Sequence, residues 1–490
     1  SITGGTISIE GAGHGTYGAA YFENGSTYTP TGGVLSFVGD DTAALYSAEA
    51  DDADFNLYSL TVGDGTNAKI LSIDTDTVLD LDLDGTLTIS TNATFDSNAE
   101  NILVGGSWTN NNIYIHDNNQ VTFNGSGTQT IAGVDSDNDD FYDVVLAGGT
   151  MSIAANYAGA PPDMEVDNDF TLSSGTLDFN ASFLKVRNDF SKNGGNIIMD
   201  QGTAAIEVDN DYTITADAGS SDWSDGYTTV SGDVAISGDN TFVYGGVGHP
   251  IFTINGTGDF TISVTGANNF FGTLANEAEV DVNLGTAVSS LTMSSALTIR
   301  DLQVYKGIFD TNSNDLTVYR VFVMSLDGAT SVFNMASGTF TLGSDDLAPT
   351  LVSIWHQEAN STANITGGTI TIEGIGHSSF GAMFIEDGSV LNATGGTFQF
   401  IGNDDSVIDI EESDVADFNL YNLILGDATN SQTITLSASS TINFDINNDL
   451  TINANATLDA NGEPITLAGD WTNSGTFTHS NNTVTFDHAD

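Results

Sequence analysis

Apolar and polar residues alternate along most of this chain, in stretches of three to five residues. Examples are LTIS from Leu87, LDLDLDG from Leu79 and TITLS from Thr433. Alternation with a period of two predicts β-strands that bury one face and expose the other. Pairs of Gly, Asn, Asp or Ser separate the stretches and favour tight turns with positive φ. No window keeps a period of 3.6 residues, so the pattern predicts strands and turns without long helices.

The strands recur with a regular cadence. MEVDNDF begins at Met164, LKVRNDF at Leu184 and IEVDNDY at Ile206, which places Asn-Asp-aromatic triplets at Asn168, Asn188 and Asn210. The triplets follow one another at steps of roughly 20 to 22 residues, which is a period typical of repeat architectures. Because one such unit cannot bury its own apolar face, it must stack on the next. Asparagines that recur at turns can bond to their counterparts in neighbouring coils, so we expect these three to be structural.

Three short strands in each coil of about 20–22 residues predict an all-β fold, a parallel β-helix or β-solenoid in the form of an elongated rod. A string of antiparallel β-sandwich domains is the alternative. It would place boundaries about every 90 to 110 residues and strands at a spacing of about 8 to 12 residues. The cadence near 20 and the lack of proline-marked joints favour the solenoid.

A much longer repeat contains this cadence. The opening SITGGTISIEGAGH returns as NITGGTITIEGIGH from Asn364, and the two copies stay aligned without a gap to the last residue. We therefore expect one continuous solenoid over residues 1–490, with a first long unit at 1–363 and a second copy at 364–490 that matches 1–127. Surface loops normally drift in length, so the constant length indicates that every residue sits in a regular track.

The strong net negative charge of the chain limits the binding partners that we expect. There are 66 Asp and Glu against seven Lys and Arg, which gives a formal net charge of −59. Nucleic acid and anionic membranes are excluded as expected partners, because the cations that bind phosphate are missing. Close assembly of such chains would need screening salt or bound divalent cations. The chain has no cysteine, and its apolar runs are too short to span a bilayer, so we expect no membrane insertion.

One phrase resembles a known class of proteins. The stretch from Leu450 to Asp487 reads LTINANATLDANGEPITLAGDWTNSGTFTHSNNTVTFD, and the first copy carries the further ending VTFNGSGTQTIAG from Val121. This wording resembles bacterial extracellular β-helical repeat proteins of the giant adhesin and surface-fibre type. The resemblance implies secretion, a solenoid fold and a role in surfaces, adhesion or matrix. It carries no catalytic residue.

A polysaccharide lyase or glycoside hydrolase on a β-helix is one alternative function. Lyases of acidic polysaccharides generally need Arg or Lys to meet the substrate carboxylates. Lys185, Arg187 and Lys192 fall within about one coil and could form a small basic island. Paired carboxylates for a glycosidase are unavoidable in so acidic a chain and therefore indicate little. We predict no catalytic residue, no required cofactor and no enzymatic activity.

Calcium is the metal that the sequence favours. Asp135, Asp137 and Asp139 follow a D-x-D-x-D rhythm suited to a hard cation, although the Gly and Glu of an EF-hand loop are missing. Asp80, Asp82 and Asp84 alternate along one strand and could bind divalent ions between rods.

The histidines do not predict a metal site. His14 and His377 are one position in two copies, as are His116 and His479, and no second His lies at ligand spacing.

We expect an extracellular or cell-surface structural protein. A solenoid has two open edges that must be covered, and neither a capping helix nor a polar cover is readable near either end of this sequence. The coils would assemble head to tail into a homopolymer, or belong to a longer tandem-repeat chain, and so build a fibre, sheath or surface layer. An adhesin stalk or binding module, with a glycan among the ligands to consider, is the other alternative.

Overall fold

The alternating stretches form short strands that bury every second residue. In Leu87–Ile89 the two apolar residues face inward and Thr88 faces outward. The computed structural model describes residues 3–28, 30–48, 56–75, 80–133, 140–154, 162–215, 220–222, 225–237, 241–243, 250–265, 278–325, 328–343, 354–373, 376, 380–414, 416–438 and 443–487. These residues form β-strands and no α-helix, as the pattern predicts. None of them belongs to a helix of the length and apolar character needed to cross a bilayer.

The chain divides into two compact units, which are described separately. Unit 1 comprises Ser1–Thr228 and Gly238–Gly248, and unit 2 comprises Thr229–Ser237 and His249–Asp490. The repeat boundary at Ala363 and Asn364 falls inside a single strand, Ser361–Glu373, rather than between the units. The prediction of one continuous solenoid over the whole chain stays a prediction.

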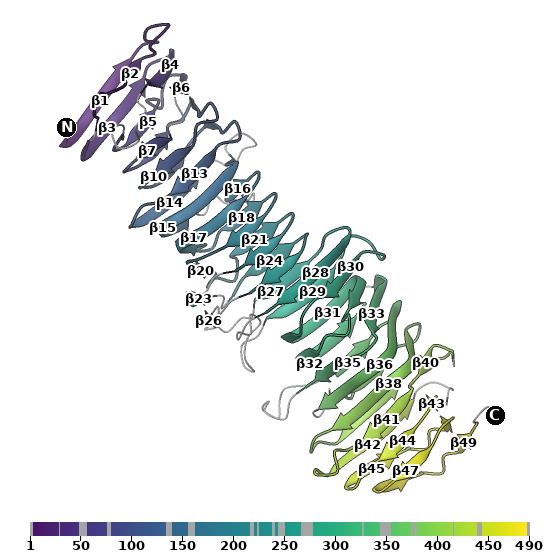
Figure 1. Cartoon of the computed structure of the whole chain (residues 1–490). Coiled ribbons are helices and arrows are strands. Elements are labelled where there is room, and N and C mark those ends of the chain that lie inside the picture. The colour runs from purple at the N-terminus through teal and green to yellow at the C-terminus, as the bar shows by residue number, and fades with distance from the viewer. Residues whose placement is uncertain are drawn as a thin grey trace. The chain divides into compact units, whose positions relative to one another are not determined.

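The strands of unit 1 are short and closely spaced (Figure 1). They are β1 (Thr3–Glu10), β2 (Ala20–Phe22), β3 (Gly32–Val38), β4 (Thr42–Ser47), β5 (Leu60–Val62), β6 (Lys69–Thr75), β7 (Leu81–Leu83), β8 (Leu87–Ile89), β9 (Ala93–Asp96), β10 (Ile102–Val104), β11 (Trp108–Asn110), β12 (Ile113–Ile115), β13 (Gln120–Phe123), β14 (Thr128–Gly133), β15 (Asp143–Ile153), β16 (Met164–Val166), β17 (Phe170–Asp178), β18 (Phe183–Val186), β19 (Phe190–Lys192), β20 (Asn196–Ile198), β21 (Ala205–Val208), β22 (Tyr212–Ile214), β23 (Ser220–Asp222) and β26 (Thr241–Val243). The strand β24 (Tyr227–Val230) has residues in both units.

Unit 2 includes the longest strands. It contains β25 (Val234–Ile236), β27 (Ile251–Ile254), β28 (Asp259–Val264), β29 (Glu279–Asn283), β30 (Ser290–Met293), β31 (Leu297–Asp310), β32 (Leu316–Met324), β33 (Ser331–Met335), β34 (Thr339–Leu342), β35 (Ile354–Gln357), β36 (Ser361–Glu373), β37 (Met383–Ile385), β38 (Val390–Ile401), β39 (Ser406–Ile410), β40 (Phe418–Asn419), β41 (Asn422–Leu425), β42 (Gln432–Ala438), β43 (Phe444–Ile446), β44 (Leu450–Ile452), β45 (Ala456–Asp459), β46 (Ile465–Leu467), β47 (Trp471–Asn473), β48 (Thr476–Thr478) and β49 (Val484–Phe486).

Each strand pairs in parallel with a strand of the next coil, which confirms the predicted β-solenoid and rules out antiparallel sandwiches. Met164 pairs with Leu184 and Leu184 with Ile206, so these coils have the lengths that the Asn-Asp-aromatic cadence predicts. Other coils differ in length: the coil from Ile102 to its partner Val121 is slightly shorter, and the coil from Val321 to Ile354 is much longer. The additional residues fall between strands, so the strands stay aligned while the coil length varies.

The two copies of the repeat fold into the same succession of coils. The first copy pairs Ile7 with Leu35, Leu35 with Leu60, Leu60 with Leu87 and Leu87 with Trp108. The second pairs Ile370 with Phe398, Phe398 with Leu423, Leu423 with Leu450 and Leu450 with Trp471. Each coil of the second copy therefore has the same length as its counterpart in the first, although the lengths differ from coil to coil. The regular track that the gapless alignment predicts is confirmed for these coils.

The interior is filled by side chains that stack from coil to coil. Phe170, Phe190 and Tyr212 occupy one inward position in successive coils and are fully buried. Their rings stack nearly parallel, with centroids 5.5 Å and 5.1 Å apart. Stacks of this kind give each coil a large contact area with the coils directly before and after it.

Candidate functional site

The Asn-Asp corners form a ladder of hydrogen bonds between coils. Asn188 Nδ2 donates to Asp169 Oδ1 at 2.7 Å, and the same oxygen accepts the backbone N–H of Asp189 at 3.2 Å. The same pair of bonds joins Asn168 and Asp169 to Asp143, and Asn210 and Asp211 to Asp189. The predicted structural role of Asn168, Asn188 and Asn210 is confirmed, and the acceptor is an aspartate of the preceding coil.

The three basic residues expected to form one island lie on opposite sides of the solenoid wall. Lys185 and Arg187 point outward at β18, whereas Lys192 points inward from β19 and is fully buried. Lys192 pairs in register with Leu172 and Ile214, so it stands in an otherwise apolar file. Burial lowers the pKa of the Lys192 ammonium. The expectation that these three cations share one surface is therefore wrong for Lys192.

Lys185 is paired with acids of the next coil. Its Nζ lies 2.7 Å from Glu207 Oε1 and 3.3 Å from Asp209 Oδ1. This cation therefore neutralises carboxylates of the chain itself.

A depression of about 570 Å³ opens at the end of β12. It is lined by Ile113, Tyr114, Ile115, His116, Asp117, Asn118, Asp140 and Asp167. The lining of this His116 depression combines the apolar Ile113 and Ile115 with three carboxylates and an imidazole.

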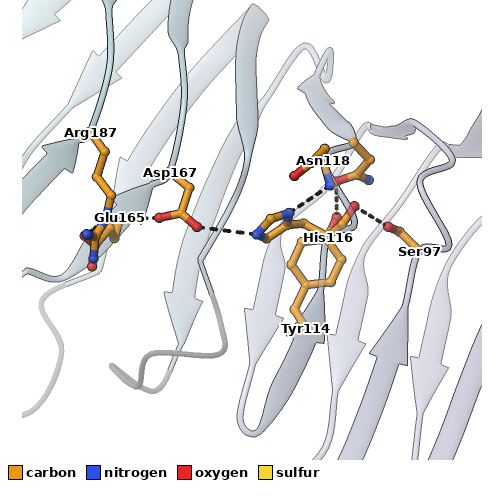
Figure 2. A network of polar contacts seen from close by, with 8 residues as sticks. Ser97, Tyr114, His116, Asn118, Glu165, Asp167 and Arg187 are labelled. Carbon is orange, nitrogen blue, oxygen red and sulfur yellow. Dashed lines mark hydrogen bonds and ion pairs between the residues drawn. The ribbon is translucent and has the colours of Figure 1, made fainter. Parts of the chain in front are cut away.

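The backbone turn that presents His116 is held by hydrogen bonds (Figure 2). His116 Nδ1 accepts the backbone N–H of Asn118 at 3.0 Å, and the His116 carbonyl accepts the Ser97 hydroxyl at 2.8 Å. The Tyr142 ring stacks on the imidazole, with centroids 5.4 Å apart and planes inclined by 24°. These contacts fix the imidazole ring with its Nε2 directed at Asp167.

Asp167 links the imidazole to the remaining outward-facing cation of the expected basic island. His116 Nε2 lies 3.4 Å from Asp167 Oδ2, while Arg187 Nε lies 3.0 Å from Asp167 Oδ1 and 2.5 Å from Glu165 Oε1 (Figure 2). Asp167 therefore lies between the imidazole of His116 and the guanidinium of Arg187. Chemically, the depression can accept a cationic group with an aliphatic stem, since apolar side chains and carboxylates both line it.

The second copy repeats the turn and changes its lining. His479 Nδ1 accepts the backbone N–H of Asn481 at 3.0 Å, as His116 does from Asn118. Ser480 stands where the first copy has Asp117. The geometry of the turn is thus a property of the repeat, whereas its acidity belongs to the first copy.

The aspartates predicted to bind calcium have different positions in the structure. Asp82 lies on the outer face of β7 between the buried Leu81 and Leu83, and its Oδ2 accepts a hydrogen bond from Asn56 Nδ2 at 3.4 Å. Asp80 and Asp84 flank this strand, so the three alternate as the sequence indicates. Asp135, Asp137 and Asp139 lie outside the described residues. Within the described part of the chain, no three His, Asp or Glu side chains are grouped to hold a metal ion.

His14 belongs to a tight turn. Its Nδ1 accepts the backbone N–H of Thr16 at 3.2 Å, and its carbonyl accepts the N–H of Gly18 at 2.8 Å. His377, its counterpart, lies outside the described residues.

In unit 2, Asp281 of an acidic pair has a raised pKa. Asp281 and Glu279 share the outer face of β29, and Gln303 Nε2 donates to Glu279 Oε1. Arg300 and Arg320 both contact Asp301, at 3.5 Å and 3.2 Å. Burial, followed by the charge and hydrogen bond of Glu279 and the charge of Asp301, raises the pKa of Asp281 to about 7.

This pKa predicts that unit 2 loses stability as the pH rises. Because the folded-state pKa lies above the unfolded value of 3.8, the stabilising contribution of protonated Asp281 is complete below pH 3.8 and is lost through pH 7. We expect Asp281→Asn to flatten the decline in denaturant midpoint between pH 5 and pH 8. Asp315→Asn is the control, since hydrogen bonds from Thr339 lower the pKa of Asp315. An unchanged pH profile in the Asp281 variant would contradict the assignment.

No protein-family model, curated protein or solved structure matches this chain. The described geometry and the sequence therefore carry the functional argument by themselves.

Proposed function

We propose that the protein is an extracellular, non-enzymatic structural protein whose stacked coils build a fibre, sheath or surface layer. The coils would continue by pairing head to tail, within a longer tandem-repeat polypeptide or between molecules. Localisation at the cell surface, self-association and a contribution from calcium are parts of this proposal. The acidic composition supports it, because a chain with a net charge of −59 assembles only where salt or divalent cations screen or bridge it.

One observation supports the proposal: the second long unit stacks directly on the first, since β36, which contains the start of the second copy, pairs with β33 and β34. Ile7 of β1 is 42 % exposed, whereas its counterpart Ile370 of β36 is fully buried beneath β34. At the other edge Phe486 is 64 % exposed, whereas its counterpart Phe123 is fully buried. At the junction of β36 with β33 and β34, a coil that opens a long unit accepts the coil that closes the unit before it.

The covered copy also shows which backbone groups would form the contact. Thr369 donates its N–H to the Gly338 carbonyl at 3.0 Å, across the side of β36 that corresponds to the open side of β1. Because N–H directions alternate along a parallel strand, the N–H groups of Thr6 and Ser8 face that open side. An open row of such groups is a template for pairing with another strand.

Electron microscopy of the 490-residue chain tests the proposal. We expect filaments much longer than a single molecule in calcium or in high salt, and separate particles in low salt with a chelator. Growth in calcium alone would assign the acidic surface a bridging role, whereas equal growth in high salt would assign it a screened one. Separate particles under every condition would contradict assembly.

A substitution at the edge makes the test specific. Ser8→Pro removes an N–H on the open side of β1, and proline is tolerated at strand edges. We expect it to abolish filaments while the folded chain persists, as measured by circular dichroism. Ser8→Thr keeps the N–H and should leave filament growth unchanged. Filaments of normal length from Ser8→Pro would show that assembly does not use β1.

A further inference from the structure

The outer face of one sheet in unit 1 carries several large apolar side chains. The strands β2, β4, β6, β9 and β12 pair in parallel and form a five-stranded sheet. Four of the most exposed large apolar side chains among the described residues lie on this sheet or at its margin. They are Tyr17, Tyr21, Ile70 and Ile115, which are 49 %, 39 %, 42 % and 38 % exposed. Together with Tyr46 and Ile113 they define what we call the β2–β12 face.

The register of the paired strands aligns several of these residues in rows across the sheet. Ile70 and Ile113 lie in one row with Thr94 between them, and Tyr21 is directly opposite Tyr46. The Tyr17 ring packs against Tyr21, and Tyr21 against Tyr46, with centroids 4.9 Å and 5.1 Å apart. Acidic residues lie among these apolar ones: Tyr46 is directly opposite Asp74, and Ile115 is directly opposite Asp96.

The second copy shows that folding does not require four of these residues. Its inward residues remain apolar at the equivalent strands, as in Ile434 and Leu458, which are buried like Leu71 and Phe95. Outward, however, the first-copy residues Tyr46, Ile70, Ile113 and Ile115 are replaced by Asp409, Thr433, Thr476 and Thr478. Tyr17 and Tyr21, in contrast, are matched by Phe380 and Phe384. The coils of the second copy form without the other four apolar residues, so the fold does not require those four.

The His116 depression adjoins the β2–β12 face. Ile113 and Ile115 belong to both, and Asp117, Asp140 and Asp167 also line the depression. The β2–β12 face and the depression therefore present exposed apolar side chains together with carboxylates, a combination suited to a partner that has both apolar and basic residues. The carboxylates select a cationic partner, and the net charge of −59 disfavours a second copy of this chain.

We propose that the β2–β12 face and the His116 depression together dock a polypeptide that carries lysine or arginine side chains between apolar residues. One basic side chain enters the depression, its aliphatic stem against Ile113 and Ile115 and its head group at the carboxylates. The apolar residues of the partner cover Ile70 and Tyr21. This interaction is lateral to the coil stacking of the proposed function and does not depend on it.

Fluorescence anisotropy with defined peptides tests the proposal. The probe is a fluorescein-labelled 13-residue peptide of alternating Lys and Val, and two matched peptides replace every Lys by Glu or every Val by Ser. We expect the Lys-Val peptide to bind more tightly than either control, and its affinity to fall as salt increases. Binding of the Ser-substituted peptide with equal affinity would reduce the effect to charge alone and overturn the proposal.

The chain supplies its own matched variant. Ile70→Thr, Ile113→Thr, Ile115→Thr and Asp117→Ser together give the first copy the residues of the second. We expect this variant to bind the Lys-Val peptide at least about tenfold more weakly, with an unchanged circular dichroism spectrum, because exposed substitutions cost little stability. Should the fourfold variant unfold, Asp117→Ser alone provides the same comparison at the depression. Undiminished binding by a folded variant would overturn the proposal.

Hydrogen exchange locates the contact. Protection on adding the Lys-Val peptide should be confined to β2, β4, β6, β9 and β12, and absent from the equivalent β37, β39, β42, β45 and β48. Equal protection of both copies would contradict the assignment. Tight binding of an uncharged oligosaccharide such as cellohexaose at the β2–β12 face, in place of the peptide, would instead identify a glycan surface and overturn the choice of a basic polypeptide.

Discussion

Phe190→Ala is expected to destabilise the coils around β19 by about 3–5 kcal/mol. Phe190 is fully buried between Phe170 and Tyr212, and its ring stacks on both. Truncation would leave a cavity and break the aromatic stack in the middle, which neither neighbouring coil can fill without moving. Because a solenoid unfolds in units of neighbouring coils, hydrogen exchange at β17, β19 and β22 is the appropriate measurement.

Two control variants separate packing from position. Phe190→Leu retains most of the volume and should cost markedly less than the alanine variant. Ser191→Ala changes the adjacent outward residue and should stay within about 0.5 kcal/mol of the parent. If all three variants exchange at the same rate, the aromatic stack is not what holds these coils together.

Ile370→Ala and Ile7→Ala should differ although they change the same position of the repeat. Ile370 is buried between β34 and β38, so its truncation should cost about 2–5 kcal/mol. Ile7 is 42 % exposed, and its truncation should cost less than about 0.5 kcal/mol. Hydrogen exchange at β36 and β1 measures the two effects in the same chain.

The comparison also reports on assembly. Under conditions where filaments form, the cost of Ile7→Ala should rise towards that of Ile370→Ala, because β1 is then covered by a further coil. A cost that stays the same in filaments and in separate molecules would contradict stacking at this edge.

The sequence predicts the solenoid well because two kinds of information agree in it. Alternation identifies the inward residues, and the Asn-Asp-aromatic cadence gives the coil length around Asn168, Asn188 and Asn210. The ladder of hydrogen bonds at these corners confirms that interpretation. Coil lengths elsewhere were not predictable, because additional residues between strands do not disturb the pairing of strands such as β32 and β35.

Properties that depend on contacts between residues far apart in the sequence were harder to predict. Lys192 could have been placed inside, since NDFTL, NDFSK and NDYTI align it with Leu172 and Ile214. The contact between His116 and Asp167 joins residues that are far apart in the sequence, and no local pattern marks it. The raised pKa of Asp281 likewise depends on burial and on Asp301 of the next coil. The apolar outer face became visible only when alternation was combined with the observed strand order.

The equal coil lengths of the two copies have a genetic consequence. Because every aligned position lies at the same point of the same coil, crossing over between the two copies of the gene segment would join coil to coil at whatever point it occurred. The products would differ by a whole 363-residue unit, and each new junction would keep the register of a strand pairing present in the parent. A lineage carrying this gene can thus change the length of its protein in large steps without passing through a misfolded intermediate.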